Sequence, residues 1–213
     1  MKSQQKLVIF STIGLILFFM ISGYIYKNYK SNEISNMAKQ NASLFEREYS
    51  MSVGNKDAKV HLVEFFDPAC ETCAQFKPLV QKIINDNKGK IRLTLRYAPY
   101  HNGSDYVVKM LEAARKQGKF EETLDMMFAT QKYWASHGEP NLQALWKFLP
   151  KLGLDIDKIM TDMKDPKLDK IIAQDLADAK VLGANKTPSY FVNGKPLQRF
   201  GYEQLKELIY SEL

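Results

Sequence analysis

The sequence predicts an α/β fold preceded by a membrane-spanning helix. Residues 59–66 and 91–98 are apolar and rich in β-branched and aromatic side chains, and a helical pattern separates them, which is the order of a β-α-β unit. A long helical stretch follows, and residues 187–213 then predict a β-hairpin and a last helix. Residues 7–26 carry no charge. The predicted order is therefore an apolar helix, β-α-β, a helical block and β-β-α.

The composition is that of an ordinary globular protein. The chain has 213 residues, of which 45% are hydrophobic and 25% charged, enough for one domain with an insertion or for two small domains. The formal net charge is +6, but residues 1–30 contain four lysines and no acidic residue. The rest of the chain is thus nearly neutral, and we expect no nucleic-acid partner.

Residues 7–26 are predicted to form a transmembrane anchor. As a helix with a rise of about 1.5 Å per residue, this stretch spans about 30 Å, the thickness of the hydrocarbon core of a bilayer. A cleaved secretory signal is the alternative, but no A-x-A pattern follows the apolar run. Lys2 and Lys6 favour an N-terminus on the inner side. We therefore expect residues 1–6 to form a cytoplasmic tail and the body to be exported.

Residues 27–50 form a polar linker between the anchor and the body. Six apolar side chains in this linker recur at roughly helical spacing: Ile34, Met37, Ala38, Leu44, Phe45 and Tyr49. One interpretation is an amphipathic helix that docks on the body or pairs with other copies of the chain. The other, which we favour, is a partly helical stalk. The body is expected to begin near residue 51.

Turn and breaker residues set the limits of the predicted elements. The helix between the two strands begins at the cysteine pair and ends near Gly89, and Pro78 within it predicts a kink. The helical block that follows is interrupted at Gly118. Asn193-Gly194 is a strong signal for a two-residue turn, which predicts the hairpin near the C-terminus.

The chain has two cysteines, Cys70 and Cys73, in the stretch FFDPACETCAQF. A structural zinc site usually takes four cysteine or histidine ligands, and His61, His101 and His137 lack the spacing of such a site. Two inert core thiols are another alternative. The position of the pair, directly after a strand and at the start of a helix, favours a redox couple instead.

A cysteine at the start of a helix faces unpaired backbone N–H groups and the positive end of the helix dipole. Both favour the thiolate, so we expect a lowered pKa for Cys70 and assign it the role of attacking and leaving sulfur. Cys73 follows three residues later on the same helix face and is able to close a disulfide with Cys70. Cys73 is therefore the predicted resolving cysteine.

Four segments in order, KVHLVEFFDPACETC, GKFEETLDMMFATQ, KLGLDIDKIM and ADAKVLGANKTPSYFVNGKPL, resemble the DsbA-like thioredoxin-fold thiol:disulfide oxidoreductases. The resemblance extends over roughly residues 51–213. It implies a thioredoxin-like domain formed by residues 51–102 and 183–213, with a helical insertion at 103–182. It also implies that the redox pair is Cys70 and Cys73.

Thr187-Pro188 matches the Thr–cis-Pro loop of the family, which lies beside the redox cysteines. The resemblance implies that this loop binds substrate, with the backbone of Thr187 pairing with an extended segment of the substrate. X-Pro is the type of peptide bond that adopts the cis form at low cost. An ordinary trans proline at the start of a strand is the alternative interpretation.

Glu64 matches the family's acidic residue six positions before the first cysteine. A carboxyl group on a buried strand has a raised pKa, and the resemblance implies that such a group moves protons to and from Cys73. The alternative is a glutamate at the solvated end of the strand.

The two residues between the cysteines, Glu71 and Thr72, depart from the family pattern. In the strongly oxidising members of the family that this chain resembles, the two residues between the cysteines are Pro-His, and the histidine stabilises the thiolate. Glu71 is expected to do the opposite, because a carboxylate repels the Cys70 thiolate and raises its pKa. A less stable thiolate makes the disulfide less oxidising, so we expect a milder oxidant than the strongest members of the family.

The leading functional prediction is a membrane-tethered, exported enzyme that exchanges disulfides with protein substrates. The oxidising direction is the one we favour. It requires no metal and no cofactor beyond the redox-active disulfide Cys70–Cys73, and it implies a membrane redox partner. The resemblance suggests a single-pass protein of the inner membrane of a bacterium, with its catalytic domain in the periplasm or outside the cell.

Two other functions stay open at the level of sequence. One is a disulfide reductase or isomerase, which an oligomer built through residues 33–49 would support. The other is a binding protein, either a chaperone or a copper-handling module. Among weaker site candidates, Tyr97, Tyr133 and Trp134 fit either a peptide groove or the core, and His101 follows the second strand closely enough to approach the cysteines.

Overall fold

The computed structural model describes residues 3–135 and 140–213, and within them five strands form one mixed sheet. Their order across the sheet is β1-β3-β2-β4-β5. The strands are β1 (Met51–Val53), β2 (Val60–Phe66), β3 (Ile91–Tyr97), β4 (Ser189–Val192) and β5 (Lys195–Pro196). The helices are α1 (Ser3–Gln40), α2 (Glu71–Asp86), α3 (Ser104–Arg115), α4 (Phe120–Ala129), α5 (Gln131–Trp134), α6 (Gln143–Trp146), α7 (Ile156–Asp162), α8 (Pro166–Leu182) and α9 (Tyr202–Tyr210), with 3-10 turns η1 (Ala42–Leu44) and η2 (Leu149–Leu152).

Strand β2 lies between β3, which runs parallel to it, and β4, which runs antiparallel. Glu64 on β2 is level with Leu95 on β3 and Tyr190 on β4, and the next residue, Phe65, is level with Arg96. Successive side chains of a strand point to opposite faces of the sheet. Glu64 and Arg96 therefore lie on opposite faces, although they come from neighbouring strands.

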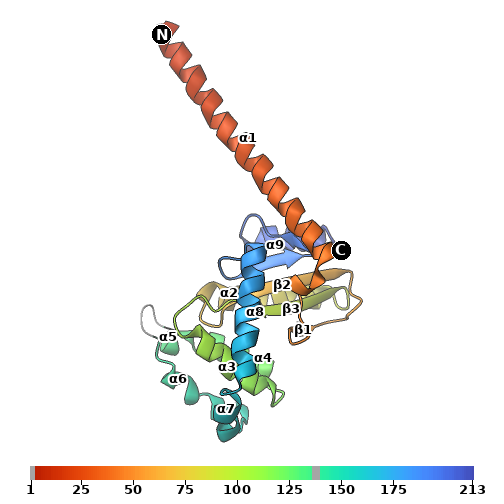
Figure 1. Cartoon of the computed structure of the whole chain (residues 1–213), viewed down its shortest axis with the longest axis vertical. Helices are drawn as coiled ribbons and strands as arrows, with labels where there is room; N and C mark the ends of the chain where they lie inside the picture. The colour runs from red at the N-terminus through yellow and green to blue at the C-terminus, as the bar shows by residue number, and fades with distance from the viewer. Residues whose placement is uncertain (1–2, 136–139) are drawn as a thin grey trace.

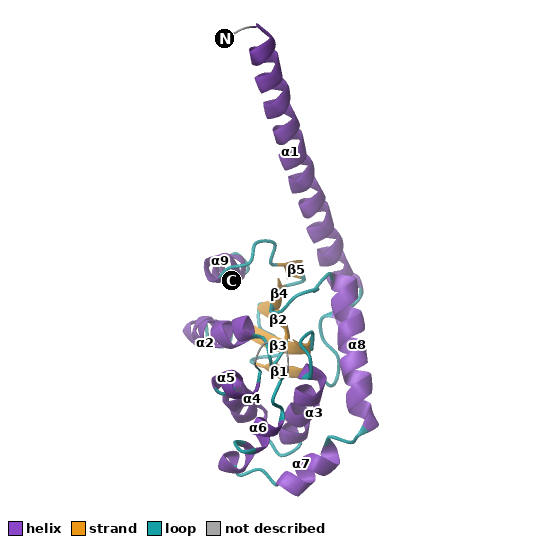
Figure 2. Ribbon diagram, turned by 90° about the vertical axis from the view of Figure 1, so that its left-hand side faces the viewer, coloured by secondary structure: helices purple, strands orange, loops and turns teal. Residues whose placement is uncertain are grey.

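Helices cover both faces of the sheet (Figure 2). Helices α2 and α9 lie on one face, and α8 lies on the other. On the α2 face the buried side chains of Leu62 and Phe66 belong to the same core cluster as Val80 of α2. On the α8 face Phe65 packs in a second cluster with Leu182 of α8. Each such buried side chain contributes roughly 1.5–3 kcal/mol relative to an exposed one, so both faces hold the layers together.

Helix α2 starts directly after the cysteine loop, as predicted. Cys70 is its N-cap residue, and the helix continues from Glu71 to Asp86 with Pro78 inside it. Gly89 follows the end of the helix in a left-handed conformation, with φ +78°, which favours glycine. Strand β1 was not predicted, because three residues are too short to give a recognisable alternation of apolar and polar side chains.

The C-terminal hairpin joins β4 to β5 through Asn193 and Gly194. Both turn residues have positive φ, 49° and 78°, as a type I′ turn requires. The Asn193 side chain also accepts a hydrogen bond from the backbone N–H of His61, at 2.8 Å. The predicted turn is confirmed, and Asn193 fastens it to β2.

Helix α1 extends away from the body (Figure 1). Its stretch Ile9–Ile34 is long and apolar enough to cross a bilayer. The end of the helix and the 3-10 turn after it pack on the α8 face of the sheet, where Ile34, Leu44 and Phe45 are buried. The rings of Phe45 and Phe191 meet edge to face, with centroids 5.5 Å apart. The linker therefore contacts the body of its own chain.

A buried ion network joins this linker to β3 and α8. Arg96 is fully buried and donates to Asp175 at 2.7 Å and to Asp178 at 2.6 Å. From the linker, Arg47 donates to Asp178 at 2.7 Å, and the Tyr49 hydroxyl donates to Asp175 at 2.6 Å. The network fixes the linker to the body through polar contacts as well as apolar ones.

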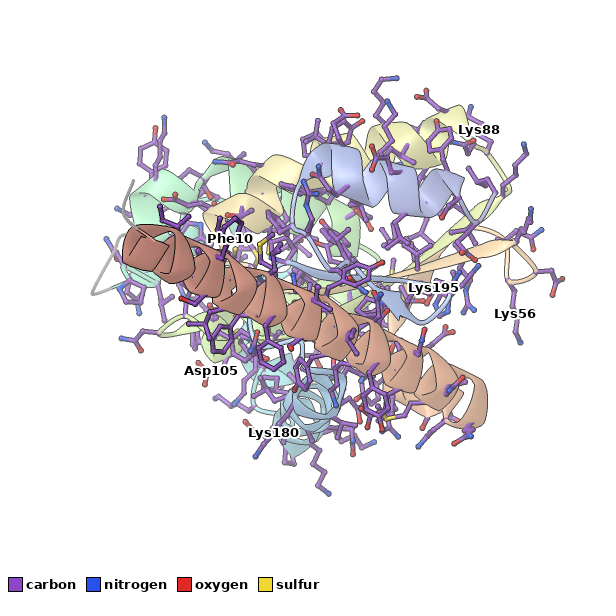
Figure 3. The ribbon with its side chains drawn as sticks, turned by 90° about the horizontal axis from the view of Figure 1, so that it is seen from above. Phe10, Lys56, Lys88, Asp105, Lys180 and Lys195 are labelled. Atoms are coloured by element: carbon purple, nitrogen blue, oxygen red, sulfur yellow. The ribbon has the colours of Figure 1, made fainter. Side chains whose placement is uncertain are left out.

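Exposed lysines are spread around the body. In Figure 3, Lys56 and Lys195 lie on the right-hand side of the body, Lys88 lies at its upper right and Lys180 at its lower edge.

Candidate active site

Cys70 and Cys73 lie where β2 ends and α2 begins. Cys70 caps the helix with extended backbone angles, φ −76° and ψ 116°, and Cys73 lies in the first turn. Both residues are free thiols and buried, with 5% and 0% of their surface exposed. The strand thus delivers the pair to a helix N-terminus, where free N–H groups face the first sulfur.

Hydrogen bonds stabilise the thiolate of Cys70. The largest effect comes from the Cys73 thiol, and the pKa of Cys70 falls to about 6 although burial opposes the shift. The Thr187 side chain and the backbone N–H groups of Cys73 and Thr72 act in the same direction. As a thiol, Cys70 Sγ is able to donate to the Thr187 carbonyl oxygen, 3.2 Å away.

Cys73 has the opposite tendency. Burial, followed by the neighbouring Cys70 and the carboxylate of Glu64, raises the pKa of Cys73 far above the ordinary thiol range. The buried sulfur is therefore a thiol whenever the pair is reduced, and the outer sulfur is the one that ionises. This asymmetry is what the predicted role of Cys70 as the attacking and leaving sulfur requires.

Glu64 lies on the α2 face of β2 and is buried, with 5% of its surface exposed. The alternative of a solvated strand end does not match this position. The Tyr190 hydroxyl donates to Glu64 Oε1 at 3.1 Å. Burial raises the pKa of Glu64 to about 8, while the Tyr190 bond and the Lys77 charge act against the shift. Glu64 is therefore mostly protonated at neutral pH.

A small cavity of about 30 Å³ lies beside Glu64. Lys77 of α2 lines it together with Glu121 of α4. The Lys77 ammonium is paired with Glu121 at 3.1 Å and with Asp125 at 2.6 Å. A volume of this size is large enough to hold about one water molecule, which would give Glu64 a neighbour able to exchange its proton.

The Thr187–Pro188 peptide bond is cis, and the loop that contains it faces Cys70. Pro188 is buried and Thr187 is partly exposed. Strand β4 begins at the next residue, Ser189. The structure therefore brings Thr187 next to Cys70, although 117 positions separate them in the sequence.

Glu71 and Thr72 occupy the first turn of α2 and line the cavity in front of Cys70. Glu71 is exposed, whereas Thr72 is partly buried and directs its backbone N–H at the Cys70 sulfur. Hydrogen bonds and burial have the largest effects on the Cys70 pKa. The repulsion expected from Glu71 is thus a smaller effect, and the milder oxidant inferred from it stays a prediction.

An open cavity of about 530 Å³ adjoins Cys70. It is bordered by the cysteine loop, the loop after β3, the two residues Ala135 and Pro140, and the loop before β4. Its lining residues are Ala69, Cys70, Glu71, Thr72, Tyr100, His101, Asn102, Ala135, Pro140, Asn185, Lys186 and Thr187. A cavity of this size accommodates a few side chains of an extended peptide.

Two of the three aromatic candidates are core residues. Tyr97 is buried and donates its hydroxyl to Glu112 at 2.5 Å. Trp134 is buried and donates its indole N–H to the carbonyl oxygen of Met127 at 2.9 Å. Tyr133 is exposed, but none of the three lines the cavity next to Cys70. The structure therefore does not place these three aromatic side chains in a peptide groove beside Cys70.

Within the described part of the chain, no group of three or more histidine, cysteine or acidic side chains is arranged to hold a metal ion. His61 bonds to Thr94 on β3, and His101 bonds to Asp67. His137 lies outside the described residues. The groups that act on the two sulfurs include the other thiol of the pair, the carbonyl oxygen of Thr187 and the carboxyl group of Glu64.

The family model described as thioredoxin matches residues 46–211, which include every element from β1 to α9. The chain belongs to the thioredoxin family. The predicted thioredoxin-like α/β fold is therefore confirmed, and so is the apolar N-terminal helix in front of it.

Curated relatives in this family fall into two groups. A Na(+)/H(+) antiporter NhaA of Herminiimonas arsenicoxydans is 30% identical over 145 residues, which are 68% of this chain but 22% of the antiporter. The chain thus spans about a fifth of the length of these first relatives. A probable disulfide bond formation protein D of Bacillus anthracis is 26% identical over 223 residues, covering 100% of this chain and 99% of the relative.

Solved structures with a similar fold include a thioredoxin-like oxidoreductase and a thiol-disulfide exchange protein. A thioredoxin-like oxidoreductase from Silicibacter pomeroyi has a TM-score of 0.68 and 31% identity, covering 80% of this chain and 96% of that one. The thiol-disulfide exchange protein alpha-DsbA2 from Wolbachia pipientis has a TM-score of 0.70 and 22% identity, covering 86% and 97%. The predicted resemblance to DsbA-like thiol:disulfide oxidoreductases is confirmed.

Sequence reasoning missed one buried residue of this thioredoxin-family site. Asp67, in the loop before Cys70, is fully buried and accepts hydrogen bonds from Ala69, Tyr100, His101 and Ser104. The available signal was an acidic residue in an otherwise apolar stretch, three positions before the first cysteine. Asp67 joins the cysteine loop to the loop that follows β3.

Proposed function

We propose that this chain is a membrane-tethered, exported thiol:disulfide oxidoreductase that introduces disulfides into protein substrates. The observation that carries the proposal is the opposed ionisation of the two cysteines. Hydrogen bonds lower the pKa of Cys70 to about 6, whereas burial raises the pKa of Cys73. A protonated carboxyl, Glu64, interacts electrostatically with both cysteines of the pair.

The reaction begins with the oxidised enzyme. A substrate thiolate attacks Cys70 Sγ, the Cys70–Cys73 bond breaks, and its electron pair goes to Cys73. Glu64 is mostly protonated at neutral pH, since burial raises its pKa to about 8, and it supplies the proton that Cys73 needs. The product of this step is a mixed disulfide between substrate and Cys70.

A second thiolate of the substrate then attacks the substrate sulfur of the mixed disulfide. Cys70 leaves as a thiolate, which the Thr187 side chain and the N–H groups of the first turn of α2 stabilise. The substrate has lost two electrons and gained a disulfide, and the enzyme ends as a dithiol. A membrane redox partner must accept these two electrons, and the anchor keeps the enzyme close to such a partner.

The low pKa of Cys70 favours the oxidising direction. A stable thiolate stabilises the reduced enzyme relative to its disulfide, and this raises the reduction potential of the pair. The backbone at Thr187 and Pro188, next to Cys70, offers an edge on which an extended substrate segment is able to pair. Recognition of this kind accepts many sequences, as a general oxidant requires.

We further propose the inner membrane of a bacterium as the location of the enzyme. Helix α1 would cross the bilayer with residues 1–6 inside, and the catalytic body would lie in the periplasm or outside the cell. Residues 51–102 and 183–213 would form the thioredoxin-like domain, and residues 103–182 its helical insertion. An oligomer built through residues 33–49 would support the reductase or isomerase alternative, but Ile34, Leu44 and Phe45 of this segment are packed in their own chain.

The equilibrium reduction potential of the Cys70–Cys73 pair tests the direction. The full chain, purified in detergent micelles, is titrated against glutathione buffers, and the Cys73→Ala variant gives the baseline of an enzyme without the disulfide. We expect a value nearer to about −120 mV than to about −270 mV, the values of a dedicated oxidant and of a reductant. A value near −270 mV would overturn the oxidative direction.

A further inference from the structure

The buried carboxylate of Asp67 holds His101 at the edge of the cavity next to Cys70. Asp67 Oδ1 accepts from the Ala69 N–H at 2.8 Å and from the Ser104 hydroxyl at 2.6 Å. Asp67 Oδ2 accepts from the N–H groups of Tyr100 and His101, at 2.8 and 2.9 Å. Backbone N–H groups can only donate, so both oxygens of Asp67 act as acceptors.

This arrangement determines the tautomer of His101. Its Nδ1 lies 2.7 Å from Asp67 Oδ2. Because that oxygen accepts hydrogen bonds, Nδ1 carries the hydrogen and donates it. In the neutral ring Nε2 is then left with a free lone pair, and the side chain is half exposed, at 50%. The geometry is that of a histidine base oriented by a carboxylate.

His101 lines the same cavity as Cys70. The other charged groups of that lining are Glu71 at the start of α2 and Lys186 in the loop before β4. Tyr100, next to His101, is engaged elsewhere, since its hydroxyl donates to the carbonyl oxygen of Ala184 at 2.5 Å. Among the side chains that line the cavity, imidazole is the type that exchanges protons near neutral pH.

We propose that His101, positioned by Asp67, is the general base that deprotonates the incoming substrate thiol. The proposal rests on the function proposed above. His101 Nε2 takes the proton of the substrate thiol, and the resulting thiolate attacks Cys70 Sγ. The Cys70–Cys73 bond breaks, and Cys73 receives its proton from Glu64. Two acid–base groups thus serve the two sulfurs from separate sides.

A base on the substrate side meets a definite need. An ordinary cysteine thiol has a pKa near 8.5, so only a few per cent of it is thiolate at pH 7. Glu64 is buried and does not line the cavity next to Cys70, so it does not serve the incoming thiol. His101 is the histidine that lines the cavity through which the incoming thiol would reach Cys70.

The test is a comparison of two thiols with the oxidised full chain in detergent. One is a peptide with a single cysteine of ordinary pKa, and the other is 2-nitro-5-thiobenzoate, which is already ionised at neutral pH. In His101→Ala we expect the rate with the peptide to fall about tenfold at pH 6.5, a loss limited by the few per cent of thiolate present without a base. The deficit should disappear near pH 9.5, and the rate with nitrothiobenzoate should stay at the wild-type value.

Imidazole in the buffer should restore the peptide rate of His101→Ala, which a purely structural role of the side chain would not allow. His61→Gln, a histidine on β2 outside the cavity, is the matched control and should react like the wild type. An equal loss with both thiols, a loss at every pH or no loss would overturn the proposal. If the wild type itself reacts with neither thiol, the proposed function is wrong, independently of His101.

Discussion

The two faces of the sheet both bury carboxyl groups but hold them in opposite states. On the α2 face, Glu64 has a tyrosine hydroxyl as partner, and burial raises its pKa to about 8. On the α8 face, burial also acts on Asp178, but Arg47 and Arg96 outweigh it, and the pKa of Asp178 lies below its ordinary range. For these two groups, a cation within hydrogen-bonding distance makes the difference between a fixed charge and a carboxyl that is able to carry a proton.

The difference separates structure from chemistry within one sheet. Arg96 and its partners join three segments that are distant in sequence: the linker after α1, strand β3 and helix α8. Such a network contributes only while both signs are present, because removing one partner leaves a buried charge unpaired. Among the described residues, no ion pair of Glu64 is seen, and the proposed proton transfer to Cys73 depends on the protonated state of Glu64.

The largest effect should come from Arg96→Met, which removes the central cation of the α8 face. The buried carboxylates of Asp175 and Asp178 then lose their main partner, and we expect the free energy of unfolding to fall by about 3–5 kcal/mol. Urea unfolding of the full chain in detergent, followed by tryptophan fluorescence, measures this loss.

Arg47→Met is the matched control for that variant. The Arg47 side chain is 27% exposed, so water takes over part of its role and the expected loss is smaller, about 1 kcal/mol. The Cys70 pKa, read from thiolate absorbance, should be unchanged in both variants because the network lies across the sheet. Equal losses, or a changed Cys70 pKa in Arg96→Met, would contradict the separation of the two faces.

Glu64→Gln tests the other face and should affect the reaction more than the fold. Glutamine keeps the shape of the side chain but supplies no proton to Cys73, so we expect disulfide exchange to slow by about 10- to 100-fold. This is at or below the usual contribution of an acid–base group, because the cavity of about 30 Å³ beside Glu64 lets water replace it in part. Stopped-flow exchange with a dithiol peptide measures the rate.

The same variant should change the pH dependence of stability. The pKa of Glu64 is raised in the folded state, from 4.5 to about 8, so the folded state binds the proton more tightly than the unfolded state does. The stability that this proton contributes is fully present below pH 4.5 and is lost as the pH rises to about 8. Measured on the oxidised protein, whose cysteines do not titrate, the wild type should lose stability over this range relative to Glu64→Gln. Parallel curves would show that Glu64 has no raised pKa.

The strand that carries Glu64 and the cysteine pair on the α2 face could be predicted from the sequence. Residues 59–66 predicted a largely apolar strand, and the family resemblance singled out Glu64 on that strand as a proton carrier. The cysteine pair, the Asn193-Gly194 turn and the order of elements were local signals of two to eight residues. Such signals can be recognised without knowledge of the tertiary structure, because they depend on local backbone angles and on the periodicity of apolar side chains.

The parts that were missed depend on contacts between distant segments. Nothing near Arg96 in the sequence indicates Asp175 or Asp178, which lie about 80 positions away. Asp67 was likewise overlooked, because its role depends on the loop after β3. The linker was expected to be a stalk, since the pattern from Ile34 to Tyr49 does not reveal which surface receives its apolar side chains.

The smallest effect is expected from Glu71→Gln. Glu71 is an exposed carboxylate at the start of α2, and exposed charges interact by about 0–1 kcal/mol, which corresponds to at most about 20 mV for a two-electron couple. Removing the negative charge stabilises the Cys70 thiolate, so the potential should become more oxidising by up to that amount. Glu203→Gln on α9, outside the cavity, is the control for loss of a carboxylate and should leave the potential unchanged. A shift toward a more reducing value would mean that Glu71 supports the thiolate, and the difference from strongly oxidising relatives would then have to arise from the hydrogen bonds of Thr187 and the first turn of α2.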